Sequence, residues 1–154
     1  MPTRLINDMD HTDRVARRGD AVAAAILVLP EYCYRCGHLT KSIVGLLLPS
    51  DLTPDPDGFV EFDIVAPLIA AALPNCKLGR FGIGPLKMRR SRLQPDGYLS
   101  NGCLHCDSIQ GSFPLHDGLT EFLAEGGTYA DLVATHCAIS RTALTNRLAA
   151  CDLA

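Results

Sequence analysis

The sequence predicts an α+β fold in which an antiparallel ribbon carries a helix-containing insertion and a helical module follows at the C-terminus. Two Cys-x-x-Cys pairs, Cys33-Tyr34-Arg35-Cys36 and Cys103-Leu104-His105-Cys106, bracket the ribbon. Short apolar runs bounded by turn residues lie between them and favour strands. Residues 117–154 have a different composition, typical of short helices. We therefore divide the chain into an N-terminal helix (1–30), a ribbon with its insertion (31–116) and a helical module (117–154).

Bulk properties exclude little but set the context. The 154 residues suit one domain with a small appendage, and the net charge of −3 gives no whole-chain argument for nucleic acid or membrane. Seven cysteines, an odd number with no evident secretory signal, favour a reducing compartment and metal binding over disulfides. The apolar run 21–29 is too short to span a bilayer. The protein is predicted to be soluble and cytoplasmic, with no membrane partner.

The first elements are assigned from periodicity. Residues 12–29 are Ala-rich, with apolar side chains at helical spacing, which predicts a helix ended by Pro30. Residues 40–48 are predicted to form a buried strand and residues 59–62 a short one. Residues 64–73 favour a buried helix, in which Pro67 fits only the first turn.

The later part of the ribbon is predicted from turn signals. Asp96-Gly97 indicates a hairpin flanked by residues 92–93 and 98–99 that leads to the second cysteine pair. Residues 108–115 are predicted to form another strand, followed by a turn at 116–118.

The cysteine pairs predict one structural Zn²⁺ site with Cys33, Cys36, Cys103 and Cys106 as ligands. A two-residue gap lets both sulfurs of a pair reach one ion, and four thiolates close a tetrahedral site. Gly37 and Asp107, which follow the pairs, tolerate the left-handed backbone that ends such a turn. The alternatives are a redox pair or unrelated buried thiols; His38 is a reserve ligand, and Cys76, Cys137 and Cys151 are expected to be buried small hydrophobes.

A basic segment precedes the second pair. Residues 77–92 contain six Lys or Arg and no acid, and the residues expected to contact nucleic acid are Lys87, Arg89, Arg90 and Arg92. Tyr34, Arg35 and His105 could add stacking or hydrogen bonds. The alternative is a solvated basic hairpin with no ligand.

The run from Arg89 to Leu115, together with Tyr32–Gly37, resembles a family of small bacterial zinc-ribbon proteins. They share an early Cys-aromatic-x-Cys-Gly, a basic strand, then Tyr-x-Ala-Asn-x-Cys-x-x-Cys and Gln-Gly-Asp. This chain departs at Ser100, Asp107 and Ser112, where the family has Ala, Gly and Asp. Because the family is largely uncharacterised, the resemblance implies a zinc ribbon over residues 31–116 and no activity.

The C-terminal segment predicts three helices, at 119–125, 129–136 and 141–150, with Thr128 and Ser140 as caps. Residues 134–148 resemble the helix-turn-helix of Fis-like bacterial regulators, although Ala138 replaces the usual turn glycine. The resemblance implies DNA contacts by Arg141, Thr142 and Thr145. The alternative is a helical hairpin that only packs on the ribbon.

No pattern favours catalysis, because four cysteines leave a metal no open position and no nucleophile motif is present. The predicted function is therefore that of a small, non-enzymatic, zinc-binding protein that binds nucleic acid. The alternative is a protein-interaction adaptor whose zinc is purely structural.

Overall fold

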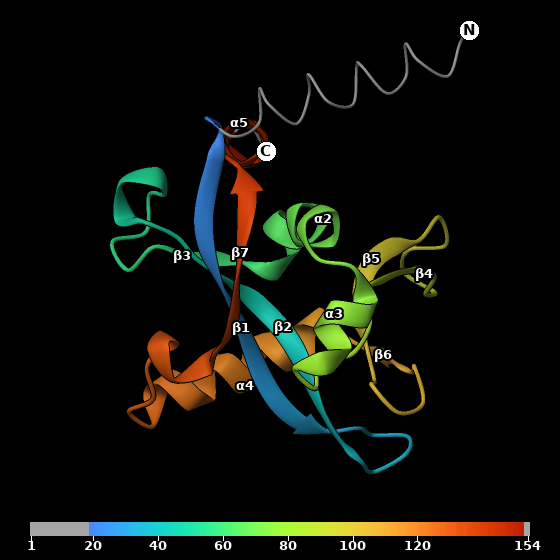
Figure 1. Cartoon of the computed structure of the whole chain (residues 1–154). Helices are drawn as coiled ribbons and strands as arrows, with labels where there is room; N and C mark the ends of the chain where they lie inside the picture. The colour runs from blue at the N-terminus through green and yellow to red at the C-terminus, as the bar shows by residue number, and fades with distance from the viewer. Residues whose placement is uncertain (1–18, 153–154) are drawn as a thin grey trace, which may run out of the picture.

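The computed structural model describes residues 19–152, which form two antiparallel sheets and the helices around them (Figure 1). The main sheet has the order β3-β2-β1-β7. Its strands are β1 (Ala21–Tyr32), β2 (Leu39–Leu47), β3 (Phe59–Glu61) and β7 (Val133–Ser140). It thus combines strands from all three predicted segments. The second sheet has the order β4-β5-β6, with β4 (Lys87–Arg89), β5 (Tyr98–Gly102) and β6 (Ile109–Gln110).

The central strand β1 corrects the prediction of an N-terminal helix. Residues 12–18 lie outside the described part, but from Ala21 the chain is a strand paired with β2 on one side and β7 on the other. Val22, Ala24 and Ile26 are buried in alternation. Because alanines occupy the positions between these residues, the alternation of buried and exposed side chains is not visible in the sequence. Pairing with two neighbouring strands outweighs the helical propensity of Ala. Pro30 lies beyond the β7 pairing, where its missing N–H has no strand to bond.

Each face of the main sheet is covered by helices, and the core has two parts. Ile26 and Val28 of β1 pack toward α2 (Phe62–Ala72), whereas Leu27 and Leu29 pack toward α4 (Ser112–Ala124). This alternation is expected of a strand buried on both faces. The predicted strands at 40–48 and 59–62 and the predicted helix at 64–73 are confirmed. The remaining short elements are η1 (Ser50–Leu52), α3 (Asn75–Arg80) and η2 (Tyr129–Leu132).

Pro67 lies inside α2 and not in its first turn, so the predicted position of this proline was wrong. Its ring removes the N–H that would bond the carbonyl of Asp63 four residues earlier. Arg147 supplies substitutes: its Nη2 donates to the Asp63 carbonyl (3.3 Å) and its Nε to the Ile64 carbonyl (2.9 Å). The guanidinium therefore fastens the C-terminal helix to the proline-disturbed turn.

The C-terminal segment is only partly as predicted. The final helix α5 (Arg141–Asp152) begins where expected, and Ser140 Oγ accepts from the Ala143 N–H (3.1 Å) as its cap. Thr128 caps only the short η2 turn. The predicted helix at 129–136 is wrong, because Val133–Ser140 is strand β7 in register with β1. The helix-turn-helix therefore loses its first helix, since residues 133–140 are held in the sheet.

Two boundaries near the second cysteine pair also differ. The predicted strand at 108–115 contains only the two residues of β6, and α4 begins at Ser112 and runs through the predicted turn at 116–118. The hairpin around Asp96-Gly97 exists, with Gly97 at φ 93°, but its strands pair Arg89 with Tyr98, not residues 92–93 with 98–99. Within residues 19–152, no helix is both long and apolar enough to cross a membrane.

Candidate metal centre

The two cysteine pairs form turns with the same hydrogen bonds. In the first, which we call knuckle 1 (33–38), the Cys33 N–H donates to the His38 carbonyl (2.9 Å) and the Gly37 N–H to the Cys33 carbonyl (2.9 Å). In knuckle 2 (103–108), the Cys103 N–H donates to the Ser108 carbonyl (2.8 Å) and the Asp107 N–H to the Cys103 carbonyl (3.0 Å). The residues that end the turns are left-handed, Gly37 at φ 75° and Asp107 at φ 61°.

The four cysteine sulfurs meet between the knuckles. All lie within 4.8 Å of one another, and two cross-pairs, Cys33–Cys106 and Cys36–Cys103, are separated by 3.6 Å. A tetrahedral ion with bonds of about 2.3 Å to sulfur needs sulfur atoms about 3.8 Å apart. The separations therefore fit one ion bound by all four thiolates. They do not fit disulfides, and all four cysteines are free.

Hydrogen-bond donors surround the sulfurs unequally. Backbone N–H groups of Arg35 and His105 donate to Cys33 and Cys103, each at 3.4 Å. The buried Gln110 adds its Nε2 to Cys33 at 3.5 Å, and the Ser108 hydroxyl lies 3.1 Å from the sulfur of Cys106. Such donors lower the charge on each sulfur and orient the ligands.

The same surroundings divide the thiol pKa values. The backbone N–H of Cys36, above all, lowers the pKa of Cys33 to about 6. The Ser108 hydroxyl and N–H lower the pKa of Cys106. The backbone N–H of His38 lowers the pKa of Cys36, but burial and the neighbouring sulfurs outweigh it and raise that pKa to about 12. Neighbouring sulfurs therefore differ in how readily each loses its proton.

Knuckle 2 is brought to knuckle 1 by contacts along the outer edge of β2. Asn101 of β5 is 1% exposed; its Oδ1 accepts from the Ile43 N–H and its Nδ2 donates to the Ile43 carbonyl, both at 2.9 Å. The Leu104 N–H donates to Thr40 Oγ1 (3.0 Å). Gly84 packs so tightly on the Gly102 carbonyl that any side chain there would overlap it. These contacts lie along the part of β2 that does not pair with β3.

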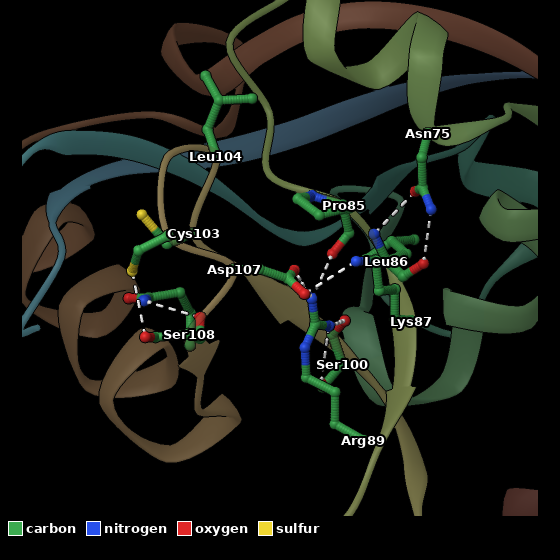
Figure 2. A network of polar contacts seen from close by, with 12 residues as sticks. Asn75, Pro85, Leu86, Lys87, Arg89, Ser100, Cys103, Leu104, Asp107 and Ser108 are labelled. Atoms are coloured by element: carbon green, nitrogen blue, oxygen red, sulfur yellow. Dashed lines mark hydrogen bonds and ion pairs between the residues drawn. The ribbon is translucent and has the colours of Figure 1, made fainter. Parts of the chain in front are cut away.

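Asp107 also fastens knuckle 2 to β4, as Figure 2 shows. Its carboxylate pairs with Lys87 Nζ (2.8 Å) and with Arg89 Nη2 (2.5 Å). Arg89 further donates to the carbonyls of Ser100 (2.6 Å) and Pro85 (3.3 Å), and its side chain is only 11% exposed. Burial raises the pKa of Asp107, but the hydrogen bonds from Lys87 and Arg89 outweigh burial and lower it.

These ion pairs engage two of the four basic residues that were expected to contact nucleic acid. Arg89 is largely buried and bound to knuckle 2, and Lys87, whose side chain is 49% exposed, is paired with Asp107. Arg90 and Arg92 are exposed in the loop after β4. The segment therefore presents fewer free cations than its composition indicates.

The predicted contacts of the final helix are likewise only partly free. Arg141 is exposed. Thr142 is engaged by Asp20, whose Oδ1 accepts from its N–H (3.0 Å) and its hydroxyl (2.8 Å), while Thr145 Oγ1 donates to the Arg141 carbonyl (2.9 Å). Hydrogen bonds from Ser140 and Thr142 lower the pKa of Asp20. The structure brings none of these three beside the basic segment through a described hydrogen bond or ion pair.

Within residues 19–152, the remaining cysteines and histidines lie outside the cluster. Cys137 is buried, and burial raises its pKa to about 11, but Cys76 and Cys151 are exposed, contrary to the prediction that all three are buried. His38, the predicted reserve ligand, is not part of the four-cysteine cluster; its ring lies against that of His105, with centroids 4.8 Å apart.

Sequence reasoning missed the residues that hold the knuckles together, namely Asn101, Ser108, Gln110 and the pairing of Arg89 with Asp107. Two signals could have found some of them: Asn101 and Gln110 are polar residues near the cysteine turn, and both match positions of the family pattern that this segment resembles. Comparison with known proteins adds no assignment, because no family model, curated protein or solved structure matches this chain.

Proposed function

We propose that this chain is a non-enzymatic Zn²⁺-binding protein in which one ion, bound by Cys33, Cys36, Cys103 and Cys106, joins two hairpins into a binding module. The observation that carries the proposal is the matched geometry of the two knuckles, which bring four sulfurs to tetrahedral separations. A structural zinc site is closed in this way, whereas a catalytic one keeps a position for water or substrate.

Zinc is favoured over other ions by the donors. Thiolate-only sites select zinc, iron–sulfur or copper(I), and a tetrahedral set on two Cys-x-x-Cys turns is typical of structural zinc. The ion would neutralise the charge of the deprotonated sulfurs. It would link residues far apart in the chain, so its binding free energy becomes folding free energy.

The test measures metal and folding together. Native mass spectrometry of the purified chain is expected to show one zinc per chain, removed by a chelator, and circular dichroism should show a large fall in thermal stability on removal. The double variant Cys76→Ser/Cys151→Ser, altered at exposed cysteines outside the cluster, should keep one zinc. A chain that stays folded and unchanged without metal contradicts the proposal.

A second candidate is a protein-interaction adaptor, favoured by one groove. It has a volume of about 640 Å³ between α2, the loop after β4 and the start of α4, and its rim carries Leu93 (94% exposed) and Phe113 (80% exposed). Exposed apolar groups around a groove are typical of partner sites. Peptides selected from a displayed library should then bind the wild type and lose binding to Phe113→Asp.

A further inference from the structure

Exposed apolar side chains gather around the knuckles. Of the eight large hydrophobic residues that are exposed within the described chain, five lie on or beside them: Tyr32 (77%), Tyr34 (72%), Leu39 (48%), Phe81 (40%) and Leu104 (38%). A soluble surface rarely collects such groups without a use. We call the surface formed by Tyr32, Tyr34, Arg35, Leu39, Lys41 and Phe81 the knuckle face.

The strand register places Tyr32, Leu39 and Lys41 together, and Tyr34 and Arg35 follow on the exposed turn of knuckle 1. Tyr32 of β1 pairs with Leu39 of β2, and Pro30 pairs with Lys41. Because side chains alternate along a strand, Tyr32, Leu39 and Lys41 project from one face of this hairpin. Lys41 Nζ lies 3.4 Å from the carbonyl of Phe81, which places the segment after α3 beside them. The hairpin tip and α3 lie on the same side of the molecule in Figure 1.

The charge on this face is positive. Arg35 is exposed on the knuckle 1 turn, and Lys41 lies on the same face of the hairpin as Tyr32 and Leu39. The helix α3, which ends beside Lys41, carries Lys77 and Arg80 in its last turn. The acid at the strand tip, Glu31, projects from the opposite face toward Gly118 of α4. Asp107 is already paired with Lys87 and Arg89. Within the described part of the chain, no ion pair engages Arg35 or Lys41, so no described carboxylate neutralises either charge.

Exposed aromatic rings with cations on the same hairpin suit a strand of unpaired bases. Each base offers a face that stacks on Tyr or Phe, and the phosphates between bases meet Lys and Arg. In a duplex the bases are already stacked on one another and unavailable. We propose that the knuckle face binds single-stranded nucleic acid, with bases on Tyr32 and Tyr34 and phosphates on Arg35 and Lys41. This inference rests on the proposed zinc site, because the ion holds the turn that carries Tyr34 and Arg35.

The test uses fluorescence anisotropy of the full, zinc-loaded chain with labelled oligothymidine and oligouridine of about 12 nucleotides. Both should bind, and the same thymidine strand in a duplex should bind more weakly. Tyr34→Ala and Tyr32→Ala should each weaken binding at least about fivefold, whereas Tyr34→Phe keeps the ring and should bind normally. Arg35→Ala should lower the slope of log affinity against log salt by about 0.7.

The matched control alters an equally exposed ring elsewhere. Phe113→Ala removes an aromatic ring that is 80% exposed from the groove beside α4, and it should not change the affinity. Tighter binding of oligouridine identifies RNA as the ligand, and tighter binding of oligothymidine identifies DNA.

The outcomes separate this inference from the proposed function. Native mass spectrometry reports zinc for every variant. A chain with one zinc that binds neither oligonucleotide, that prefers the duplex, or that ignores Tyr32→Ala and Tyr34→Ala overturns the nucleic-acid inference and leaves the zinc site standing. A chain that binds no zinc overturns the proposed function first.

Discussion

The two knuckles make the same turn but differ in what surrounds them. Knuckle 1 is the tip of the long β1–β2 hairpin, ends in Gly37 and carries exposed Tyr34 and Arg35. Knuckle 2 ends in Asp107, whose carboxylate is tied to Lys87 and Arg89, and its strand β5 is fixed to β2 by Asn101. The turn is therefore set by cysteine spacing, whereas neighbouring contacts make one knuckle an anchor and leave the other a surface.

The largest effect is expected when a cysteine of either knuckle is replaced, and it should be similar for the two knuckles. Each contributes two sulfurs to one ion, so Cys103→Ser and Cys33→Ser, at positions 1% and 3% exposed, should be similarly damaging. Structural zinc in small domains contributes roughly 10–16 kcal/mol, so either change should abolish tight zinc binding and unfold the hairpin junction. Isothermal titration with zinc and hydrogen exchange at β5 and β6 would measure this. Retention of wild-type zinc affinity by either variant would show that its cysteine is not a ligand.

The next effect belongs to knuckle 2 alone. Asn101→Ala leaves the N–H and carbonyl of Ile43 buried without partners, which should lower the free energy of unfolding by roughly 2–3 kcal/mol. Asn75→Ala serves as the control, because Asn75 makes a similar pair of bonds to Leu86 but is exposed (Figure 2). Chemical denaturation of both variants gives the comparison; an equal loss in the two would mean that burial of the Ile43 contact is not what fixes β5.

Substitutions at the two left-handed residues distinguish the cost of backbone strain from the contribution of the ion pairs. Gly37→Ala should cost about 1–2 kcal/mol, because an L side chain disfavours this backbone, and Gly37→Asp should cost less, since Asp tolerates it as it does at position 107. Asp107→Gly keeps the turn but removes the ion pairs, so its loss should shrink in high salt. Thermal denaturation at low and high salt would distinguish the two. A salt-dependent loss in Gly37→Ala would contradict the assignment.

The smallest effect is a titration. Lys87 and Arg89 lower the pKa of Asp107, so its stabilising contribution is present above the ordinary value of about 3.9 and is lost as pH falls through the lower folded-state pKa. At 46% exposure, solvent screening limits this contribution to about 1 kcal/mol or less. Carbon NMR of the Asp107 carboxyl should give a midpoint below 3.9, and Arg89→Ala should move it upward. An unshifted midpoint would show that Lys87 and Arg89 do not stabilise the charged form of Asp107.

The same contrast explains what the sequence could predict. Cysteine spacing is a local signal with one geometric solution, so the four-sulfur cluster and the turn residues Gly37 and Asp107 could be predicted. The strand at 40–48 and the helices at 64–73 and 141–150 also follow from local pattern and caps. The errors arise where distant pairing decides. Ala21–Tyr32 and Val133–Ser140 are strands because they pair with each other, and nothing within either segment reports its partner.

The number of free cations in the basic segment could not be predicted from its composition, for a related reason. Residues 77–92 contain no acid, but Asp107 neutralises Arg89 and Lys87 from a different element. Likewise, the Thr142 hydroxyl donates a hydrogen bond to Asp20, which is far from it in the sequence. A run of like charge therefore describes composition and not the surface that the fold presents.

X-ray absorption at the zinc edge of the purified full chain would show whether both knuckles bind the same ion. We expect one zinc per chain, surrounded by four sulfur atoms at about 2.3 Å and by no nitrogen or oxygen. A first shell that contains fewer than four sulfurs, or a chain that takes up no zinc at all, would contradict it.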